Sequence, residues 1–475
     1  MREGSSILLK IKENSCAVVG VGVSNLPLID VLLSVGAHVV AYDEKSVEAL
    51  GDTAELLIQK GVELVTGDNA FDKIKENIIF RSPGIRPDKG ALAFASGRGA
   101  LVTSEMELFF ELSPAKKYVI TGSDGKTTTT TLTHLFLSAQ KERDGARAYV
   151  GGNIGTPLLP KAHEMSEKDA AVLELSSFQL MGGWCDPEKV AITNVTPNHL
   201  NWHTDMNEYV SAKCGAVGAN TKRVVLNADN EICASLDFGA REYIYFSSTK
   251  KSHADVVGNR KAAAVFEKNG KVIFSSGDKE SEILSVDDIK LPGRHNLENY
   301  MTAIALTFGE VDFDIYREVA RTFGGVPHRL EFVCELDGVK YYNSSIDSSP
   351  TRTAAALSAL SAKPIIICGG SEKGLDFEPL AKVLLERASA VILNGASRKN
   401  IRAVLDVEFA QNGRTLPVFE EETLREAIDK ARELAKKGDT VLLSPACASF
   451  DQFKNFAERG EFFKNRVLSW AKDEN

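Results

Sequence analysis

The 475-residue sequence has no apolar run of the roughly 18 residues needed to span a bilayer. Its opening residues, MREGSSILLKIKENS, also lack the apolar core of a signal peptide. The seven cysteines include no C-x-x-C pair. Such an odd, scattered set is typical of reduced cytosolic thiols and not of a disulfide framework or a zinc site. We therefore expect a cytoplasmic protein without a membrane span.

Basic residues are also scarce, since 56 Lys and Arg stand against 65 Asp and Glu and give a net charge of -9. A nucleic-acid binder needs clustered cations to displace counterions, so we expect no nucleic-acid partner. A locally basic pocket for an anionic small substrate is compatible with this charge. The chain has no fixed-period repeat and, apart from the five threonines at 127–131, no low-complexity tract.

Strand-like and helix-like segments alternate along the chain, a pattern that predicts parallel sheets covered by helices. The predicted strands include residues 16–19, 38–42, 78–80, 117–121, 170–175, 190–195, 223–227, 339–343, 364–368, 390–393 and 440–444. The length is that of two to four domains. We predict an α/β fold with three domains in series: a Rossmann-like domain at 1–104, a mononucleotide-binding domain at 105–325 and a doubly wound, Rossmann-like domain at 326–475.

The first glycine-rich loop, VVGVGVSN, places Gly20 and Gly22 after a strand, and Asp43 ends the next strand. Asn25 stands where a dinucleotide fingerprint needs its third glycine, so that fingerprint is broken. Glycines at a strand–helix turn still let a phosphate approach backbone amides, and Ser24 adds a hydroxyl. One interpretation is a tight turn without a ligand. We favour a nucleotide or nucleotide-sugar site that does not take NAD.

The second glycine-rich loop, GSDGKTTTTT, directly follows a predicted strand. Ile120 stands where a strict Walker A motif needs its first glycine. The glycines nonetheless permit an amide nest around phosphate. Lys126 is placed for the terminal phosphates, the Thr127 hydroxyl for Mg²⁺ and Thr128 for a phosphate. The other threonines are expected to be scaffold, with hydroxyls bonded back to helix carbonyls.

Three more side chains are candidates for the same site. Glu174 ends a predicted strand and His199 follows another, so both are expected at the carboxyl edge of the sheet, where ligands bind. There they could hold a metal ion. Lys213 lies in a predicted helix, where an exposed lysine is the default interpretation.

Seven motifs then occur in a fixed order along nearly the whole chain: GSDGKTT, ELSSFQL, NVTPNHLNWH, YVSAK, GRHNLENYMTA, GVPHRLE and LLSPACASFDQFKNFAERGEFF. Together they resemble the Mur ligase family of peptidoglycan synthesis, and the last motif resembles the members that add D-glutamate. The resemblance implies an ATP-dependent, amide-bond-forming ligase that joins D-glutamate to UDP-N-acetylmuramoyl-L-alanine through an acyl phosphate. It also implies a central ATPase domain and Mg²⁺, and we expect a monomer.

The resemblance further implies roles for individual residues. The catalytic set is Lys126, Glu174, His199 and Lys213, with Lys213 carbamylated. The metal site is Thr127, Glu174, His199 and Lys213. ATP contacts are Gly122, Ser123, Asp124, Gly125, Lys126, Thr127, Thr128, Asn296, Asn299 and Arg329. The UDP-substrate contacts are Gly22, Val23, Ser24, Asp43, Glu44 and Asn153, and the D-glutamate contacts are Ser348, Lys373, Ser449, Phe450 and Phe456.

The sequence departs from the family pattern at several positions. Asp124 stands where relatives often carry Asn, and Asn198 and Asn201 stand where some have Asp. Ser344 stands where an acidic residue is common, so we expect no ATP contact there. Two alternatives stay open: a related Mur or folylpolyglutamate-type ligase that adds a different amino acid, and a non-catalytic nucleotide-sugar binding protein.

Overall fold

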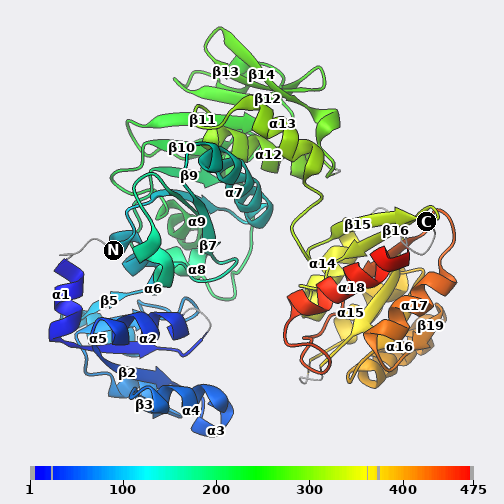
Figure 1. Cartoon of the computed structure of the whole chain (residues 1–475), viewed down its shortest axis with the longest axis horizontal. Helices are drawn as coiled ribbons and strands as arrows, with labels where there is room; N and C mark the ends of the chain where they lie inside the picture. The colour runs from blue at the N-terminus through cyan, green and yellow to red at the C-terminus, as the bar shows by residue number, and fades with distance from the viewer. Residues whose placement is uncertain (1–5, 23–24, 292, 361, 372–374, 471–475) are drawn as a thin grey trace. The chain divides into compact units, whose positions relative to one another are not determined.

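In the computed structural model of the chain, residues 6–22, 25–291, 293–360, 362–371 and 375–470 are described. Their strands form three sheets, of five, nine and six strands. The chain divides into two compact units, Met1–Phe323 with the first two sheets and Gly324–Asn475 with the third (Figure 1). The predicted α/β fold with three domains in series is confirmed, whereas the boundaries near residues 104 and 325 stay predictions.

The first sheet is entirely parallel, with strand order β3-β2-β1-β4-β5. Alternate side chains of its strands pack on opposite faces. Cys16 and Val18 share a core with α2 and α4, whereas Ala17 and Val19 pack with α5. The elements are α1 Ser6–Glu13, β1 Ser15–Val19, α2 Asn25–Ser34, β2 His38–Asp43, α3 Val47–Leu50, α4 Asp52–Gln59, β3 Glu63–Thr66, η1 Ala70–Lys73, β4 Ile78–Arg81, α5 Gly90–Gly97 and β5 Leu101–Thr103.

The second sheet has the order β14-β13-β12-β11-β10-β9-β6-β8-β7. The strands from β7 to β12 are parallel, and β13 and β14 add an antiparallel edge. The carboxyl ends of the parallel strands therefore meet at one edge, where ligands bind in such sheets.

The elements of this part of the chain are α6 Glu105–Leu112, β6 Lys116–Thr121, α7 Lys126–Arg143, β7 Ala148–Gly152, η2 Leu159–Glu164, β8 Ala170–Glu174, α8 Ser177–Leu180, β9 Lys189–Ile192, α9 Met206–Cys214, β10 Arg223–Asn227, α10 Glu231–Ser235, β11 Glu242–Ser247, α11 His253–Val257, β12 Ala263–Lys268, β13 Lys271–Ser276, β14 Lys279–Ser285, η3 Val286–Asp288, α12 Arg294–Thr307 and α13 Phe313–Thr322. On one face of the sheet, Phe136 of α7 packs edge-on against Tyr316 of α13, with ring centroids 4.8 Å apart. Phe136 also contacts Tyr300 of α12.

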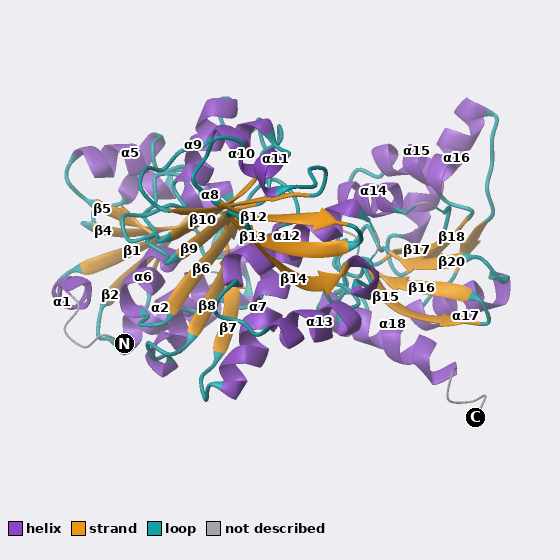
Figure 2. Cartoon of the chain, turned by 90° about the horizontal axis from the view of Figure 1, so that it is seen from above, coloured by secondary structure: helices purple, strands orange, loops and turns teal. Residues whose placement is uncertain are grey.

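The third sheet, β15-β16-β20-β17-β18-β19, is parallel except for the edge strand β15. Figure 2 shows α14, α15 and α16 on one face and α17 and α18 on the other, and two separate buried cores match these faces. The elements are β15 Glu331–Leu336, β16 Val339–Asn343, α14 Pro350–Ala359, β17 Ile365–Gly369, α15 Glu378–Arg387, β18 Ala390–Asn394, α16 Arg398–Asn412, β19 Val418–Glu420, α17 Leu424–Leu434, β20 Thr440–Leu443 and α18 Phe456–Trp470.

All seven cysteines lie in described residues and are free thiols. Within the described part of the chain, no helix is both long enough and apolar enough to cross a membrane.

One carboxyl group is buried at the first residue of α6. Glu105 is only 6% exposed, and its Oε1 accepts a hydrogen bond from Leu159 N at 3.3 Å. Burial raises the pKa of Glu105 to about 7. The ionised form is therefore disfavoured in the folded state at neutral pH.

Replacing Glu105 by glutamine keeps the acceptor and removes the charge. Because the folded pKa lies above the unfolded value of 4.5, the wild-type chain loses stability as the pH rises from about 4.5 through 7. We expect the gain in free energy of unfolding of Glu105→Gln over wild type to grow by about 2 kcal/mol between pH 5 and pH 8. Urea unfolding at both pH values measures it. Glu55→Gln, at an exposed residue of α4, is the control, and a pH-independent difference would contradict the prediction.

Candidate active site

The centre of the site is the turn between β6 and α7, formed by residues 122–125 and called here the phosphate turn. Gly122 has φ of 145° and Gly125 has φ of 77°, backbone conformations that favour glycine. The turn lies against the end of β9, because Ser123 N donates to Asn194 O at 2.8 Å and Asp124 N donates to Asn194 Oδ1 at 2.9 Å. The 18-residue helix α7 begins immediately after it. The backbone N–H groups at a helix start and the helix dipole together favour an anion at such a terminus.

The side chains of the threonine run are largely used within the fold. Thr129 and Thr130 are fully buried, and Thr131 Oγ1 donates back to Thr127 O at 2.8 Å. This is the scaffold role expected for most of the run. Thr127 and Thr128, by contrast, are half-buried in the first turn of α7. Their assignment to metal and phosphate stays a prediction.

Lys213, near the end of α9, contacts the phosphate turn. Its residue is 2% exposed, its Nζ donates to Gly122 O at 2.6 Å, and it lies 4.4 Å from the ring centroid of Tyr209. The default interpretation of an exposed helix lysine is therefore wrong. Burial, together with the charge of Lys126, lowers the pKa of Lys213 to about 7. Much of this amine is thus uncharged at neutral pH.

Lys126 and His199 complete a group of three basic side chains that interact with one another. Lys126 Nζ donates to Ser123 O at 2.8 Å. His199 has φ of 55°, and its ring packs edge-on against Phe178, with centroids 4.9 Å apart. Desolvation, followed by the charges of Lys126 and Lys213, lowers the pKa of His199, which favours a neutral imidazole that can bind a metal ion or accept a proton.

Glu174, at the end of β8, supplies the carboxylate beside the phosphate turn. It pairs in register with Ile120 of β6 and is 1% exposed. Asn153 Nδ2 donates to Glu174 Oε1 at 2.9 Å. The other oxygen, Oε2, is buried and accepts no hydrogen bond from the residues that the structure describes. A buried carboxylate oxygen without a donor is costly, and a hard cation such as Mg²⁺ would satisfy it.

The predicted metal residues thus fit a cation in chemistry, through the Glu174 oxygen and the neutral donors Thr127 and His199. Among residues 6–22, 25–291, 293–360, 362–371 and 375–470, no three His, Cys, Asp or Glu side chains are grouped to hold a metal. The predicted set includes only two residues of those types, so the set stays a prediction.

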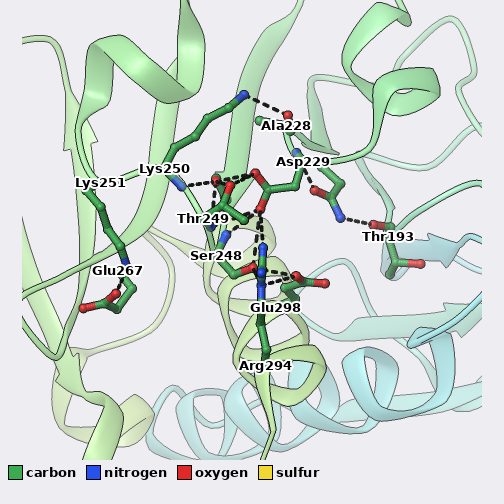
Figure 3. A network of polar contacts seen from close by, with 12 residues as sticks. Thr193, Ala228, Asp229, Ser248, Thr249, Lys250, Lys251, Glu267, Arg294 and Glu298 are labelled. Atoms are coloured by element: carbon green, nitrogen blue, oxygen red, sulfur yellow. Dashed lines mark hydrogen bonds and ion pairs between the residues drawn. The ribbon is translucent and has the colours of Figure 1, made fainter.

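The first turn of α12 is anchored by a polar network at the same sheet edge (Figure 3). Asp229, which follows β10, accepts hydrogen bonds from Ser247 Oγ at 2.7 Å and Ser248 N at 2.8 Å. Ser248 Oγ in turn donates to Glu298 Oε1 at 2.6 Å and accepts from Arg294 Nε at 2.6 Å. Because Arg294 and Glu298 are four residues apart on α12, the turn after β11 holds one face of this helix.

A second contact of α12 is with the phosphate turn and the first turn of α7. Thr129 Oγ1 donates to Asn299 Oδ1 at 3.2 Å, and Asn299 Nδ2 donates to Asn296 Oδ1 at 3.4 Å. A Cβ at Gly125 would lie 2.4 Å from Asn299 Oδ1, and the φ of 77° also favours glycine there. The structure therefore brings the predicted asparagine pair next to the predicted phosphate residues.

The predicted UDP-substrate residues lie mostly at the carboxyl edge of the first sheet. Asp43 Oδ2 accepts a hydrogen bond from Val21 N at 2.9 Å, so the carboxylate that ends β2 fixes the first glycine turn. Gly22 and Glu44 are exposed. Val23 and Ser24 lie outside the described residues. Asn153 lies in the central part of the chain, where it bonds Glu174.

The predicted D-glutamate residues lie in the second unit. Phe456, the first residue of α18, packs against His328 with ring centroids 6.0 Å apart, and its carbonyl accepts from Ser345 Oγ at 2.8 Å. Ser449 is buried, whereas Phe450 is 63% exposed. Of the other predicted residues, Ser348 is half-buried, Arg329 is exposed and Lys373 lies outside the described residues.

Several side chains beside the site were not predicted from the sequence. His203 is buried, and its ring nitrogens lie 2.9 Å from Ser177 Oγ and 3.1 Å from Glu208 Oε2. It lies four residues after His199 in the same polar segment, so the sequence could have indicated it as a further candidate. Tyr209 OH lies 3.0 Å from Ser123 Oγ, and Arg81 is a buried arginine at the end of β4. No pattern in the sequence distinguished these two.

Comparison with known proteins agrees with this geometry. The Mur ligase middle domain matches residues 120–307, and the Mur ligase glutamate ligase domain matches residues 328–447. The UDP-N-acetylmuramoylalanine–D-glutamate ligase of Clostridium novyi is 43% identical over 464 residues, 96% of this chain and 97% of the relative. The enzyme of the same name from Ruminiclostridium cellulolyticum is 42% identical over 463 residues, again 96% and 97%.

A solved structure shows the same fold. The UDP-N-acetylmuramate–alanine ligase of Thermotoga maritima superposes with a TM-score of 0.52 at 17% identity, covering 97% of this chain and 100% of that chain.

Substituting Gly122 tests the close approach on which the phosphate turn depends. A Cβ at this position would lie 1.9 Å from Thr193 Oγ1, which is held by a hydrogen bond to Asp124 O at 2.6 Å. We expect Gly122→Ala to weaken ATP binding at least tenfold and to destabilise the chain by about 1–3 kcal/mol. Calorimetry and urea unfolding measure the two effects. Gly97→Ala, where a Cβ meets nothing within 4 Å, is the control, and equal behaviour of the two variants would refute the prediction.

Proposed function

The chain belongs to the Mur ligase family, and from this premise we propose that it joins D-glutamate to UDP-N-acetylmuramoyl-L-alanine in an ATP-dependent, ADP-forming reaction of peptidoglycan precursor synthesis. The observation that carries the proposal is the near-complete coverage, at 42–43% identity, by ligases named for this reaction. The phosphate turn, the buried carboxylate of Glu174 and the buried amine of Lys213 support it. Lys126 is half-buried beside them.

The reaction begins with activation of a poor electrophile, a carboxylate. A carboxylate oxygen of the UDP-substrate attacks the γ-phosphorus of ATP, an O–P bond forms, and ADP leaves. The amine nitrogen of D-glutamate then attacks the acyl carbon, a C–N bond forms and one proton leaves the nitrogen. The bond between the acyl carbon and the bridging oxygen breaks, and inorganic phosphate departs with that oxygen. The phosphate turn, the start of α7 and Lys126 neutralise charge on the transferred phosphoryl group.

The metal site of this proposal consists of Thr127, Glu174, His199 and a carbamylated Lys213. Mg²⁺, when bound, supplies positive charge beside the phosphates. The residues of this chain supply oxygen and imidazole donors, among them Glu174 Oε2, which is buried and accepts no hydrogen bond from the described residues. His199 is a neutral donor because its pKa is lowered, first by desolvation and then by the charge of Lys126.

Carbamylation of Lys213 rests on the state of its amine. Only the uncharged amine attacks CO₂; a C–N bond forms, a proton is lost, and a carbamate anion results. A lysine whose pKa is about 7 has this reactive form available at neutral pH, which an ordinary lysine does not. The carbamate would turn a cation into an oxygen donor suited to Mg²⁺ and would face the positive charge of Lys126.

Substrate contacts are proposed at the positions implied by the family pattern. ATP contacts are Gly122, Ser123, Asp124, Gly125, Lys126, Thr127, Thr128, Asn296, Asn299 and Arg329. UDP-substrate contacts are Gly22, Val23, Ser24, Asp43, Glu44 and Asn153. D-Glutamate contacts are Ser348, Lys373, Ser449, Phe450 and Phe456. The location of Asn296 and Asn299 beside the phosphate turn supports the first set.

An amino-acid panel tests the proposed reaction. Phosphate release is measured with UDP-N-acetylmuramoyl-L-alanine, ATP and each of D-glutamate, L-lysine, diaminopimelate and L-glutamate. We expect turnover with D-glutamate alone, and Lys126→Ala should lower it by about 10²–10³-fold because a phosphoryl-stabilising charge is lost. Turnover with another amino acid would instead identify a related ligase. Binding of the UDP-substrate without phosphate release would identify a non-catalytic binding protein.

Chemical rescue tests the carbamate. We expect Lys213→Ala to lose about 100-fold or more in kcat and to recover part of it in millimolar short carboxylic acids, which replace the missing oxygen donor. The control is Lys168→Ala, at an exposed lysine, which should behave like wild type with or without the acids. Full activity of Lys213→Ala would rule out the role, and loss without any rescue would point to the ammonium form instead.

A further inference from the structure

A short segment of the N-terminal part of the chain reaches the helix that carries Lys213. It consists of residues 82–86, which follow β4, and we call it the bridge segment. At one end, Ser82 N donates to Val19 O at 2.8 Å. A Cβ at Gly20 would lie 2.9 Å from Ser82 Cβ and 3.1 Å from Ile85 Cδ1. The bridge segment thus packs directly on the first glycine turn, the proposed UDP site.

The other end of the bridge segment is bound to the central part of the chain. Trp202 Nε1 donates to Gly84 O at 3.2 Å, and Arg86 Nη1 donates to Trp202 O at 2.8 Å. The Arg86 guanidinium also lies 4.9 Å from the ring centroid of Trp202. Its two terminal nitrogens donate to the two carboxylate oxygens of Glu208 at 2.7 and 3.0 Å. The bidentate pair is sheltered, since the two side chains are 11% and 18% exposed.

Arg81, just before the bridge segment, fixes it further. This arginine is 2% exposed and donates to Pro83 O at 3.3 Å and Ile85 O at 3.2 Å within the segment. Its other nitrogen donates across to the central part of the chain, to Phe178 O at 3.2 Å and Met181 O at 2.6 Å. One guanidinium therefore donates to four carbonyls, two in the bridge segment and two in the central part of the chain.

Glu208 links the bridge segment to the active site, because it lies on α9 together with Tyr209 and Lys213. It lies in the first turn of α9, and Arg86 holds the pKa of its carboxyl at about 2, so the carboxylate stays charged. The next residue, Tyr209, contacts Ser123 of the phosphate turn. Lys213, one turn further along α9, donates to Gly122 O. A displacement of α9 would therefore move two side chains that contact the phosphate turn.

We propose that the bridge segment couples the UDP-substrate turn to the phosphate turn, with Arg86 as a positioning residue that acts through Glu208 and α9. This inference rests on the proposed function in taking the first glycine turn as the UDP site. Ligand at that turn fixes the bridge segment, the Arg86–Glu208 pair fixes α9, and Tyr209 and Lys213 then fix the phosphate turn. ATP consequently binds more tightly when the UDP site is occupied.

A contact that only stabilises the fold (a staple) and a contact that links the two binding sites (a coupler) predict different binding results when the contact is removed. Loss of a staple lowers stability and leaves the two binding equilibria independent of each other. Loss of a coupler removes the effect of one ligand on the affinity for the other, which can be measured without any turnover.

The test is calorimetric titration of a non-hydrolysable ATP analogue into the full chain, with and without saturating UDP-N-acetylmuramoyl-L-alanine, and in parallel with UDP alone. The ratio of the two dissociation constants is the coupling factor. The variants are Arg86→Ala, Glu208→Gln and the double variant. Arg86 pairs with Asp88 as well as with Glu208. Arg143→Ala is the matched control, because Arg143 likewise pairs with two carboxylates, Asp312 and Asp314, but on an exposed surface.

We expect a coupling factor of at least about fivefold in wild type and in Arg143→Ala. Arg86→Ala and Glu208→Gln should each bring it within twofold of 1, and the double variant should add nothing. Trp202→Phe, which loses the hydrogen bond to Gly84 but keeps the ring, should give an intermediate value and serves if Arg86→Ala does not fold.

A folded Arg86→Ala or Trp202→Phe variant with an unchanged coupling factor overturns the inference, as does a wild-type factor of 1 or absent UDP binding. Failure of the proposed function is separate. If D-glutamate is not ligated but the two ligands are coupled as described, the coupling stands and the assigned reaction falls.

Discussion

Gly122 comes so close to the end of β9 that a Cβ would stand 1.9 Å from the Thr193 hydroxyl, and the site is assembled around this approach. The missing side chain lets β6 turn directly into α7 while its backbone bonds the loop after β9. The carbonyl of Gly122 accepts the hydrogen bond from Lys213, and α7 begins four residues after it at Lys126, where a helix start favours an anion. A larger residue would separate these three features.

The contact with Gly122 buries the Lys213 amine, and this burial has an electrostatic consequence. An ammonium group withdrawn from water and close to Lys126 is disfavoured, which is why its pKa falls to about 7. The same surroundings would favour an anion at this position. The exposed Asp124 carboxylate raises the pKa of Lys213, but its effect is smaller than the lowering by burial and by Lys126. The structure contains no reason for an acidic residue at position 124.

The sequence predicted those features that local patterns determine. Short apolar runs predicted β1, β6 and β8 close to their observed bounds, whereas β9 ends at Ile192, before the predicted end at residue 195. The strands β7 and β19 were not predicted, because AYVGG carries glycines and VFE is only three residues long. The burial of Lys213 also escaped prediction. An isolated helix lysine is indistinguishable from an exposed one until the fold places Gly122, 91 residues away, against it.

The contacts of Arg81 and Arg86 show why the rest of the site could not be predicted. Their partners in the central part of the chain lie about a hundred residues later, and most of these are backbone carbonyls, which any residue type supplies. These contacts join the proposed UDP site and phosphate site within one compact unit, whereas the proposed D-glutamate residues belong to the other. The substrate carboxylate and the transferred phosphoryl group would thus be bound mainly by residues of the same compact unit. This arrangement suits the first step of the reaction, because the attack of the carboxylate on the γ-phosphorus needs the two groups held in fixed orientation.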